Sequence, residues 1–178
     1  SQVISLRKMC QLILTISDGL IFIVNAAETV ENNDEAVLGK TIDTVLGMLR
    51  ENDIPKKPTA IVLNKVDLVK GELMGRKALS DIFPPITSDV VDMSAVERKS
   101  ADIIHSMLWH GGDGDGTDIQ ANLRGYVNNI IRDFGEDCRV FATRLVLENH
   151  LVLNQGLDTP FLWLLAKMGV FPVKQEKK

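Results

Sequence analysis

The sequence has little of what marks several classes of protein. Only two cysteines occur in its 178 residues, so a disulfide framework is not expected and a reducing compartment is indicated. No apolar run approaches the ~20 residues that a membrane-spanning helix needs. The residues after Arg7 and Lys8 are too polar for the apolar core of a secretory signal. These absences predict a globular chain with no membrane partner.

The sequence also lacks an excess of positively charged residues and a metal-binding pattern. The net charge is −4, which excludes electrostatic nucleic-acid binding by the whole chain and leaves a local basic patch open. The three histidines show no metal-ligand spacing with each other or with the cysteines. We therefore predict no metal site from the residues present.

The most informative stretch is the apolar run 59–63, which ends in Asn64-Lys65-Val66-Asp67. Such a run is typical of a parallel strand buried on both faces. A similar run at 20–24 precedes a predicted helix at about 34–51, so the two runs and the helix form a βαβ unit. This pattern predicts an α/β fold in which polar groups follow the carboxyl end of a buried strand, where ligands bind in such sheets.

The Asn-Lys-x-Asp tetrapeptide resembles the guanine-specificity motif of GTPases related to translation factors. The resemblance implies that the Asp67 carboxylate accepts hydrogen bonds from guanine N1–H and the 2-amino group. The Lys65 stem would lie along the base, and Asn64 would contact its edge and tie neighbouring loops together. An ordinary strand-to-helix turn with solvated charges is the alternative interpretation.

A second dipeptide, Ser94-Ala95, resembles the Ser-Ala loop of the same family. We expect it after a helix at about 71–83 and a strand at 89–93, so that it also lies at a strand end. The resemblance implies that the backbone N–H of Ala95 donates to guanine O6. The predicted guanine-binding residues are therefore Asn64, Lys65, Asp67, Ser94 and Ala95.

The phosphate half of such a site is absent upstream of residue 20. The triplet Gly39-Lys40-Thr41 has Asp34 where the phosphate loop G-x-x-x-x-G-K-[ST] needs its first glycine, and it falls inside a predicted helix. No catalytic residue is predicted, and GTP hydrolysis with Mg²⁺ is expected only if a longer protein supplies the missing motifs. A fragment, a degenerate GTPase kept as a scaffold, and a misleading resemblance are all open explanations.

The expected organisation is the C-terminal half of a P-loop GTPase-like domain over 1–110, with a mostly parallel sheet and flanking helices. A glycine–aspartate linker follows at 111–117, then a small α+β appendage at 118–178. In the appendage, Ile130-Ile131-Arg132 before a predicted strand at 139–148 is similar to the start of the KH domain of Era-like GTPases. No basic G-x-x-G follows that strand, so a degenerate KH-like domain and a docking unit around a predicted helix at 161–168 both stay open.

The Era-like resemblance implies a protein that binds GTP or GDP and assists assembly of the small ribosomal subunit. Its partners would be ribosomal RNA and ribosomal or assembly-factor proteins, in the cytoplasm or the mitochondrial matrix. The alternative is a non-enzymatic pseudo-GTPase, serving as a scaffold or as a structural component of a ribosomal particle.

Overall fold

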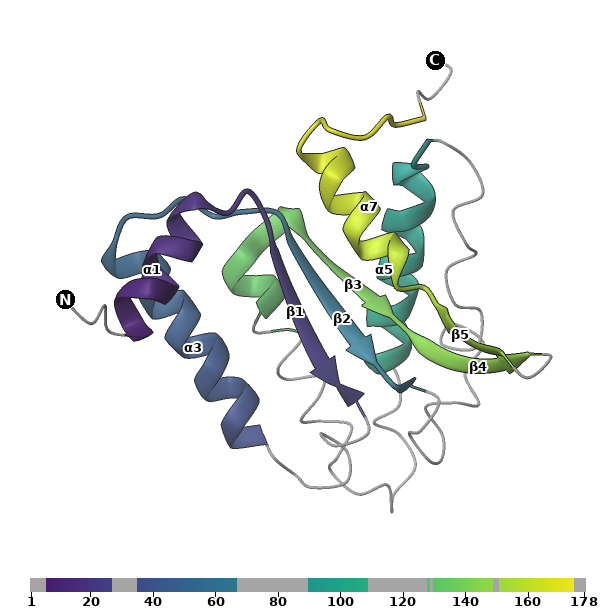
Figure 1. Ribbon diagram of the computed structural model, residues 1–178, viewed down its shortest axis with the longest axis horizontal. Coiled ribbons are helices and arrows are strands. Elements are labelled where there is room, and N and C mark those ends of the chain that lie inside the picture. The colour runs from purple at the N-terminus through teal and green to yellow at the C-terminus, as the bar shows by residue number, and fades with distance from the viewer. Residues whose placement is uncertain are drawn as a thin grey trace.

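The computed structural model describes residues 6–26, 35–66, 90–108, 128, 130–148 and 151–174. Its elements follow one another as shown in Figure 1. The predicted helix at 71–83 lies outside the described residues, as do Asp67 and the linker at 111–117. In chain order the elements are α1 (Leu6–Ile16), β1 (Leu20–Asn25), α3 (Glu35–Glu51), β2 (Thr59–Asn64), α5 (Met93–Leu108), the 3₁₀ turn η2 (Gly135–Asp137), β3 (Cys138–Ala142), β4 (Arg144–Glu148), β5 (Leu151–Gln155) and α7 (Asp158–Lys167).

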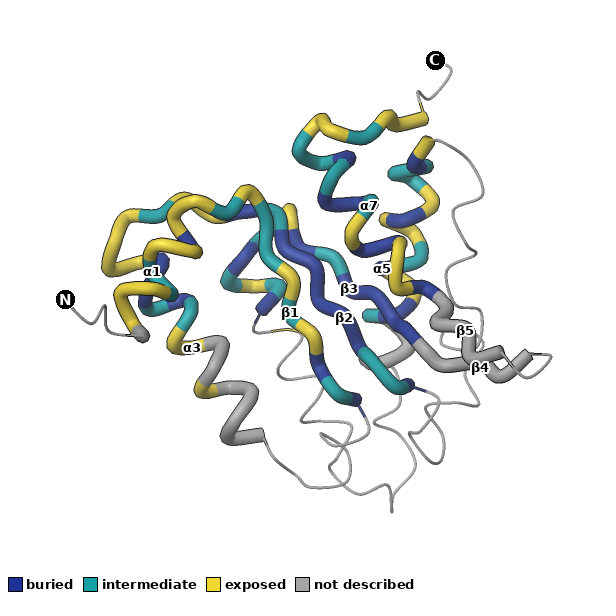
Figure 2. The backbone as a smooth tube through the Cα atoms, viewed as in Figure 1, coloured by how far each residue is buried: buried dark blue, intermediate teal, exposed yellow. Residues whose placement is uncertain are grey.

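Three parallel strands form the central sheet in the order β1-β2-β3. The middle strand β2 is buried from Thr59 to Leu63, as Figure 2 shows. A continuous apolar strand of this kind is what a parallel sheet covered on both faces requires. The predicted α/β fold is confirmed, and a parallel sheet with flanking helices is consistent with a partial P-loop GTPase domain.

Helical segments pack on both faces of the sheet, although Ile21 and Ile23 of β1 stay 43% and 65% exposed. The register aligns Phe22 with Ile61 and Ile23 with Val62, and neighbours on one strand point to opposite faces. The ring of Phe22 contacts Phe134, from the helical segment before η2, at 5.6 Å between centroids. The side chain of Phe141 lies on the other face, where α7 places Trp163 with ring centroids 5.6 Å apart.

The helix α5 lies along the outer edge of β3. The hydroxyl oxygen of Ser100 accepts a hydrogen bond from the backbone N–H of Val140 at 2.8 Å, and Glu97 pairs with Arg139 at 2.9 Å. A strand edge left open is a template for unwanted pairing. Because α5 supplies both a cover and a hydrogen-bond acceptor there, β3 is protected on the side that faces away from β2.

Two predicted strands differ from the structure. The strand predicted at 89–93 is wrong: Val91 forms a single parallel bridge to Val173, and the helix α5 starts already at Met93. The reason is Asp92, whose Oδ1 accepts the backbone N–H of Ala95 at 3.0 Å and so begins the helix. The strand predicted at 139–148 is two strands, β3 and β4, which are separated by Thr143.

The region after residue 137 contributes to two sheets. The strand β3 joins the central sheet beside β2, whereas β4 pairs with β5 in antiparallel register and, within the described residues, neither pairs with another strand. The strand β5 was not predicted. The division at 111–117 stays a prediction, but chain from both sides of it contributes strands to the central sheet. No helix in the described part of the chain is long and apolar enough to cross a membrane.

Candidate nucleotide-binding site

The carboxyl end of β2 is organised by the side-chain amide of Asn64. Its Oδ1 accepts the backbone N–H of Lys65 at 2.9 Å and the hydroxyl of Thr143 at 2.9 Å. A backbone N–H can only donate, so the atom that it contacts must be the amide oxygen. The Nδ2 group of Asn64 is therefore directed away from these two donors, as a donor that could reach a ligand.

The backbone turns sharply at the next residue. Lys65 has a φ of 59°, in the left-handed region that residues with a side chain rarely adopt. Strain of this kind costs about 1–3 kcal/mol and persists only where neighbouring groups hold it. The hydrogen bond from the Lys65 N–H to Asn64 supplies one such restraint, and a second comes from Val66, whose N–H donates to the carbonyl of Thr143 at 3.3 Å.

Thr143 is the residue that sequence reasoning missed. It is fully buried, follows β3 directly, and donates its own N–H to the carbonyl of Leu63 at 2.8 Å. Its backbone and hydroxyl thus contact residues 63, 64 and 66, and Asn64 lies 79 positions earlier in the chain. No spacing rule relates Thr143 to Asn64, so the only available signal was a polar residue directly after a strand-length run.

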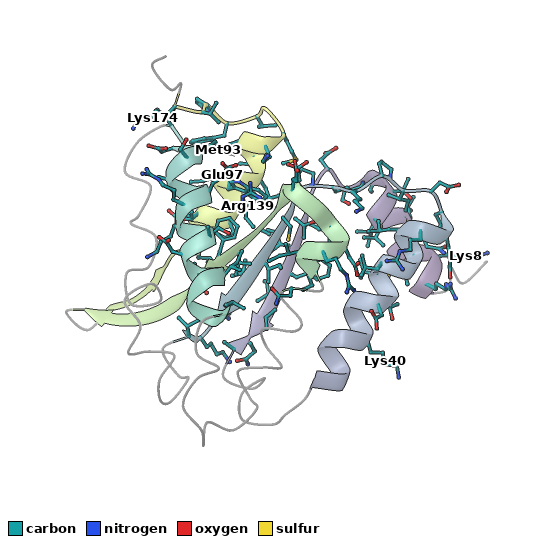
Figure 3. The ribbon with its side chains drawn as sticks, turned by 180° about the vertical axis from the view of Figure 1, so that it is seen from behind. Lys8, Lys40, Met93, Glu97, Arg139 and Lys174 are labelled. Carbon is teal, nitrogen blue, oxygen red and sulfur yellow. The ribbon has the colours of Figure 1, made fainter. Side chains whose placement is uncertain are left out.

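The structure does not bring all the predicted site residues together. Ser94 and Ala95 lie in the first turn of α5, beside the amino ends of the strands, because Glu97 one turn later pairs with Arg139 near the start of β3. Figure 3 labels Met93, Glu97 and Arg139 in this region, away from the carboxyl ends of the strands. Asn64 and Lys65 lie at the other end of the strands, where β2 ends. The expectation that residues 94 and 95 follow a strand end is therefore wrong for this structure.

The backbone N–H of Ala95 is also engaged. It donates to Oδ1 of Asp92, whose Oδ2 accepts Nζ of Lys174 at 2.8 Å. These contacts lower the pKa of Asp92, the hydrogen bond from Lys174 being the largest cause. An ionised Asp92 keeps the Ala95 N–H occupied at neutral pH, so a contact between that group and guanine O6 would require the helix cap to open.

Asp67 lies outside the described residues, so its predicted contact with guanine stays a prediction. The triplet Gly39-Lys40-Thr41 falls within α3, as expected, where backbone N–H groups are used by the helix. No group of three or more His, Cys, Asp or Glu side chains in the described ranges is placed to hold a metal ion. Burial raises the pKa of Cys138 to about 12, so this thiol stays protonated and unreactive at neutral pH.

Comparison with known proteins connects the chain to a GTPase. It is similar to GTPase HflX of Saccharolobus solfataricus, with 26% identity over 98 residues. The match covers 52% of this chain and 26% of the relative, so the chain spans about a quarter of that protein's length. No protein-family model and no solved structure matches. The similarity supports kinship with GTPases and gives no support to the narrower Era-like assignment.

Proposed function

We propose that the protein binds guanine nucleotides at the carboxyl end of β2. The supporting observation is the turn at Asn64 and Lys65, where a strained backbone and a fixed side-chain amide follow a fully buried strand. Ligands of open α/β sheets bind at this edge. The Asp67 carboxylate, two residues after Lys65, would accept the N1–H and the 2-amino group of guanine, a donor pair that adenine lacks.

In this proposal the protein serves ribosome assembly through contacts with ribosomal RNA, ribosomal proteins or assembly factors, in the cytoplasm or the mitochondrial matrix. The similarity to a GTPase supports the nucleotide. The ribosomal part of the proposal rests on the Era-like resemblance of Ile130-Ile131-Arg132 alone. Hydrolysis of GTP with Mg²⁺ would need a phosphate loop from a longer protein. Asn64 and Lys65 in this chain would hold and orient the base.

The test is nucleotide affinity of the full-length protein and its Asp67→Asn variant, measured by calorimetry with GDP and with xanthosine diphosphate. An amide donates where the carboxylate accepted, so the variant should lose at least about tenfold in affinity for GDP while gaining relative affinity for the xanthine nucleotide. Asp18→Asn is the matched control, because the exposed Asp18 precedes β1 and so lies at the amino end of the strands, away from the proposed site.

Unchanged guanine selectivity in Asp67→Asn would refute the site. Absence of any guanine-nucleotide binding by the wild-type full-length protein would instead favour the non-enzymatic scaffold. In that case the turn at Lys65 is a structural feature of a degenerate GTPase fold, and the two interpretations are separated without measuring hydrolysis.

A further inference from the structure

We infer that Thr143 is the positioning residue of the proposed base-binding turn. This inference rests on the proposed function for its ligand, and on the described contacts for its mechanism. Thr143 contacts the turn three times: its N–H with Leu63, its hydroxyl with Asn64, and its carbonyl with Val66. The three contacts bracket Lys65, the one residue of the turn in the left-handed region.

The backbone contacts of Thr143 extend the pairing between β2 and β3 by one residue. The N–H of Thr143 bonds to the carbonyl of Leu63 at 2.8 Å, in the same direction as the register that pairs Leu63 with Ala142. Any residue except proline could make this contact. The backbone therefore fixes where the end of β3 lies, but it does not explain why a threonine occupies the position.

The hydroxyl of Thr143 supplies what is specific to this residue. Asn64 Oδ1 accepts two hydrogen bonds, and the Thr143 hydroxyl is the only one of the two donors that comes from outside the turn. The side chain of Thr143 is fully buried, so water cannot readily replace it as a donor. Removing the hydroxyl leaves the amide of Asn64 held by a single bond to its own neighbour, and its rotation is then less restricted.

Orientation of the Asn64 amide has a direct consequence for a ligand. With Oδ1 held by two donors, the Nδ2 group is the part of the amide that is directed away from them. A rotated amide would present an acceptor there instead. Thr143 therefore determines which of the two groups of Asn64 faces the base, and it stabilises the backbone conformation that projects Lys65.

The variant that tests this role is Thr143→Val, which keeps the branched shape and both backbone contacts while it removes the hydroxyl. Thr143→Ser is the complement, because it keeps the hydroxyl and loses only a methyl group. Thr159 provides the matched control: it is equally buried, and its hydroxyl has no hydrogen-bond partner among the described residues. Thr159→Val therefore makes the same chemical change without breaking a contact.

Two readouts are needed, and the first uses no nucleotide. Amide hydrogen exchange at Lys65 and Val66 should accelerate about fivefold to tenfold in Thr143→Val, which corresponds to the loss of one ordinary hydrogen bond. Exchange there should be near wild type in Thr143→Ser and in Thr159→Val. The second readout is affinity of the full-length protein for GDP, which should fall by a similar factor in Thr143→Val and recover in Thr143→Ser.

The outcomes separate this inference from the proposed function. Unchanged exchange at Lys65 and Val66 in Thr143→Val overturns the positioning role whatever the nucleotide data show. Faster exchange with unchanged affinity for GDP also overturns it, because nucleotide binding would then not depend on the hydrogen bond between Thr143 and Asn64. If the wild-type protein binds no guanine nucleotide, the proposed function fails, and the exchange data alone decide whether Thr143 holds the turn.

Discussion

Replacing Lys57 by methionine should destabilise the protein, although no predicted site residue is touched. The side chain of Lys57 is only 8% exposed, and its Nζ donates to the backbone carbonyls of Thr15, at 3.2 Å, and of Ser17. These carbonyls belong to the last turn of α1 and the residue after it, and that turn contains no basic residue of its own. Lys57 therefore supplies from another segment the positive charge that a helix C-terminus favours.

The expected loss can be worked from these contacts. Hydrogen bonds to a charged group contribute roughly 1.5–3 kcal/mol each, and a charge at a helix terminus about 0.3–1 kcal/mol. Methionine avoids the cost of burying an ammonium, and the carbonyl of the exposed Thr15 can bond to water instead. The net loss should thus be about 1–2 kcal/mol in the free energy of unfolding, which corresponds to roughly 3–6 °C in the melting temperature.

Urea unfolding followed by tryptophan fluorescence measures this loss, since Trp163 is fully buried. Lys56→Met is the matched control, because Lys56 is the exposed neighbour and its replacement should change stability by less than about 0.5 kcal/mol. The difference between the two variants should persist at high salt, because a buried contact is screened less than a surface pair. Equal stability of the two variants would refute the reasoning.

Two further predictions concern a pair of glycines and the cap of α5. Gly47→Ala should stabilise the protein by about 0.5–1 kcal/mol, because a Cβ in this helix meets nothing within 4 Å. Gly19→Ala should destabilise it, because its Cβ would lie 3.1 Å from the buried Leu164 side chain and 3.3 Å from the backbone carbonyl of Pro58, which Leu20 holds by a hydrogen bond. Thermal melts of both variants should shift in opposite directions, and equal shifts would contradict the packing argument. Because the pKa of Asp92 is lowered when folded, its contribution is present above its ordinary pKa of 3.8 and is lost as pH falls below that value. The stability difference between wild type and Asp92→Asn should therefore be constant well above pH 3.8 and shrink as the pH falls below 3.8 in melts at low salt. A difference that stays constant below pH 3.8 would contradict this expectation.

The strands β1 and β2 could be predicted because each is a continuous apolar run in the sequence. The apolar runs at 20–24 and 59–63 match β1 and β2 closely, and parallel pairing follows from the helix between them. The start of α5 could not be predicted in the same way. Val90 and Val91 favour a strand by composition, yet Asp92 caps a helix and Pro172 and Lys174 engage Val91 from the other end of the chain.

The residues of the candidate site likewise include some that local sequence could predict and some that it could not. Asn64 and Lys65 were predictable because they directly follow the run that forms β2. Ser94 and Ala95 were expected to follow a strand that does not form, so the structure does not place them beside Asn64 and Lys65, and their contact with guanine stays a prediction. The contribution of Thr143 depends on a contact between positions 79 residues apart, which local spacing cannot reveal.

Among the described residues, two with a side chain have a positive φ, and they show why the turn after β2 is more than a strand end. Asp53 has a φ of 49°, but it ends α3: its N–H bonds to the carbonyl of Arg50, and the next N–H bonds to Leu49, the usual pattern of a helix C-terminus. The end of the helix α3 therefore explains the positive φ of Asp53. No helix ends before Lys65, and its conformation is held instead by a side-chain amide and a buried residue from another strand. Local preference and tertiary contacts disagree at Lys65, and such disagreements gather at functional sites. That contrast supports a ligand at this edge of the sheet on grounds independent of the tetrapeptide that first suggested it.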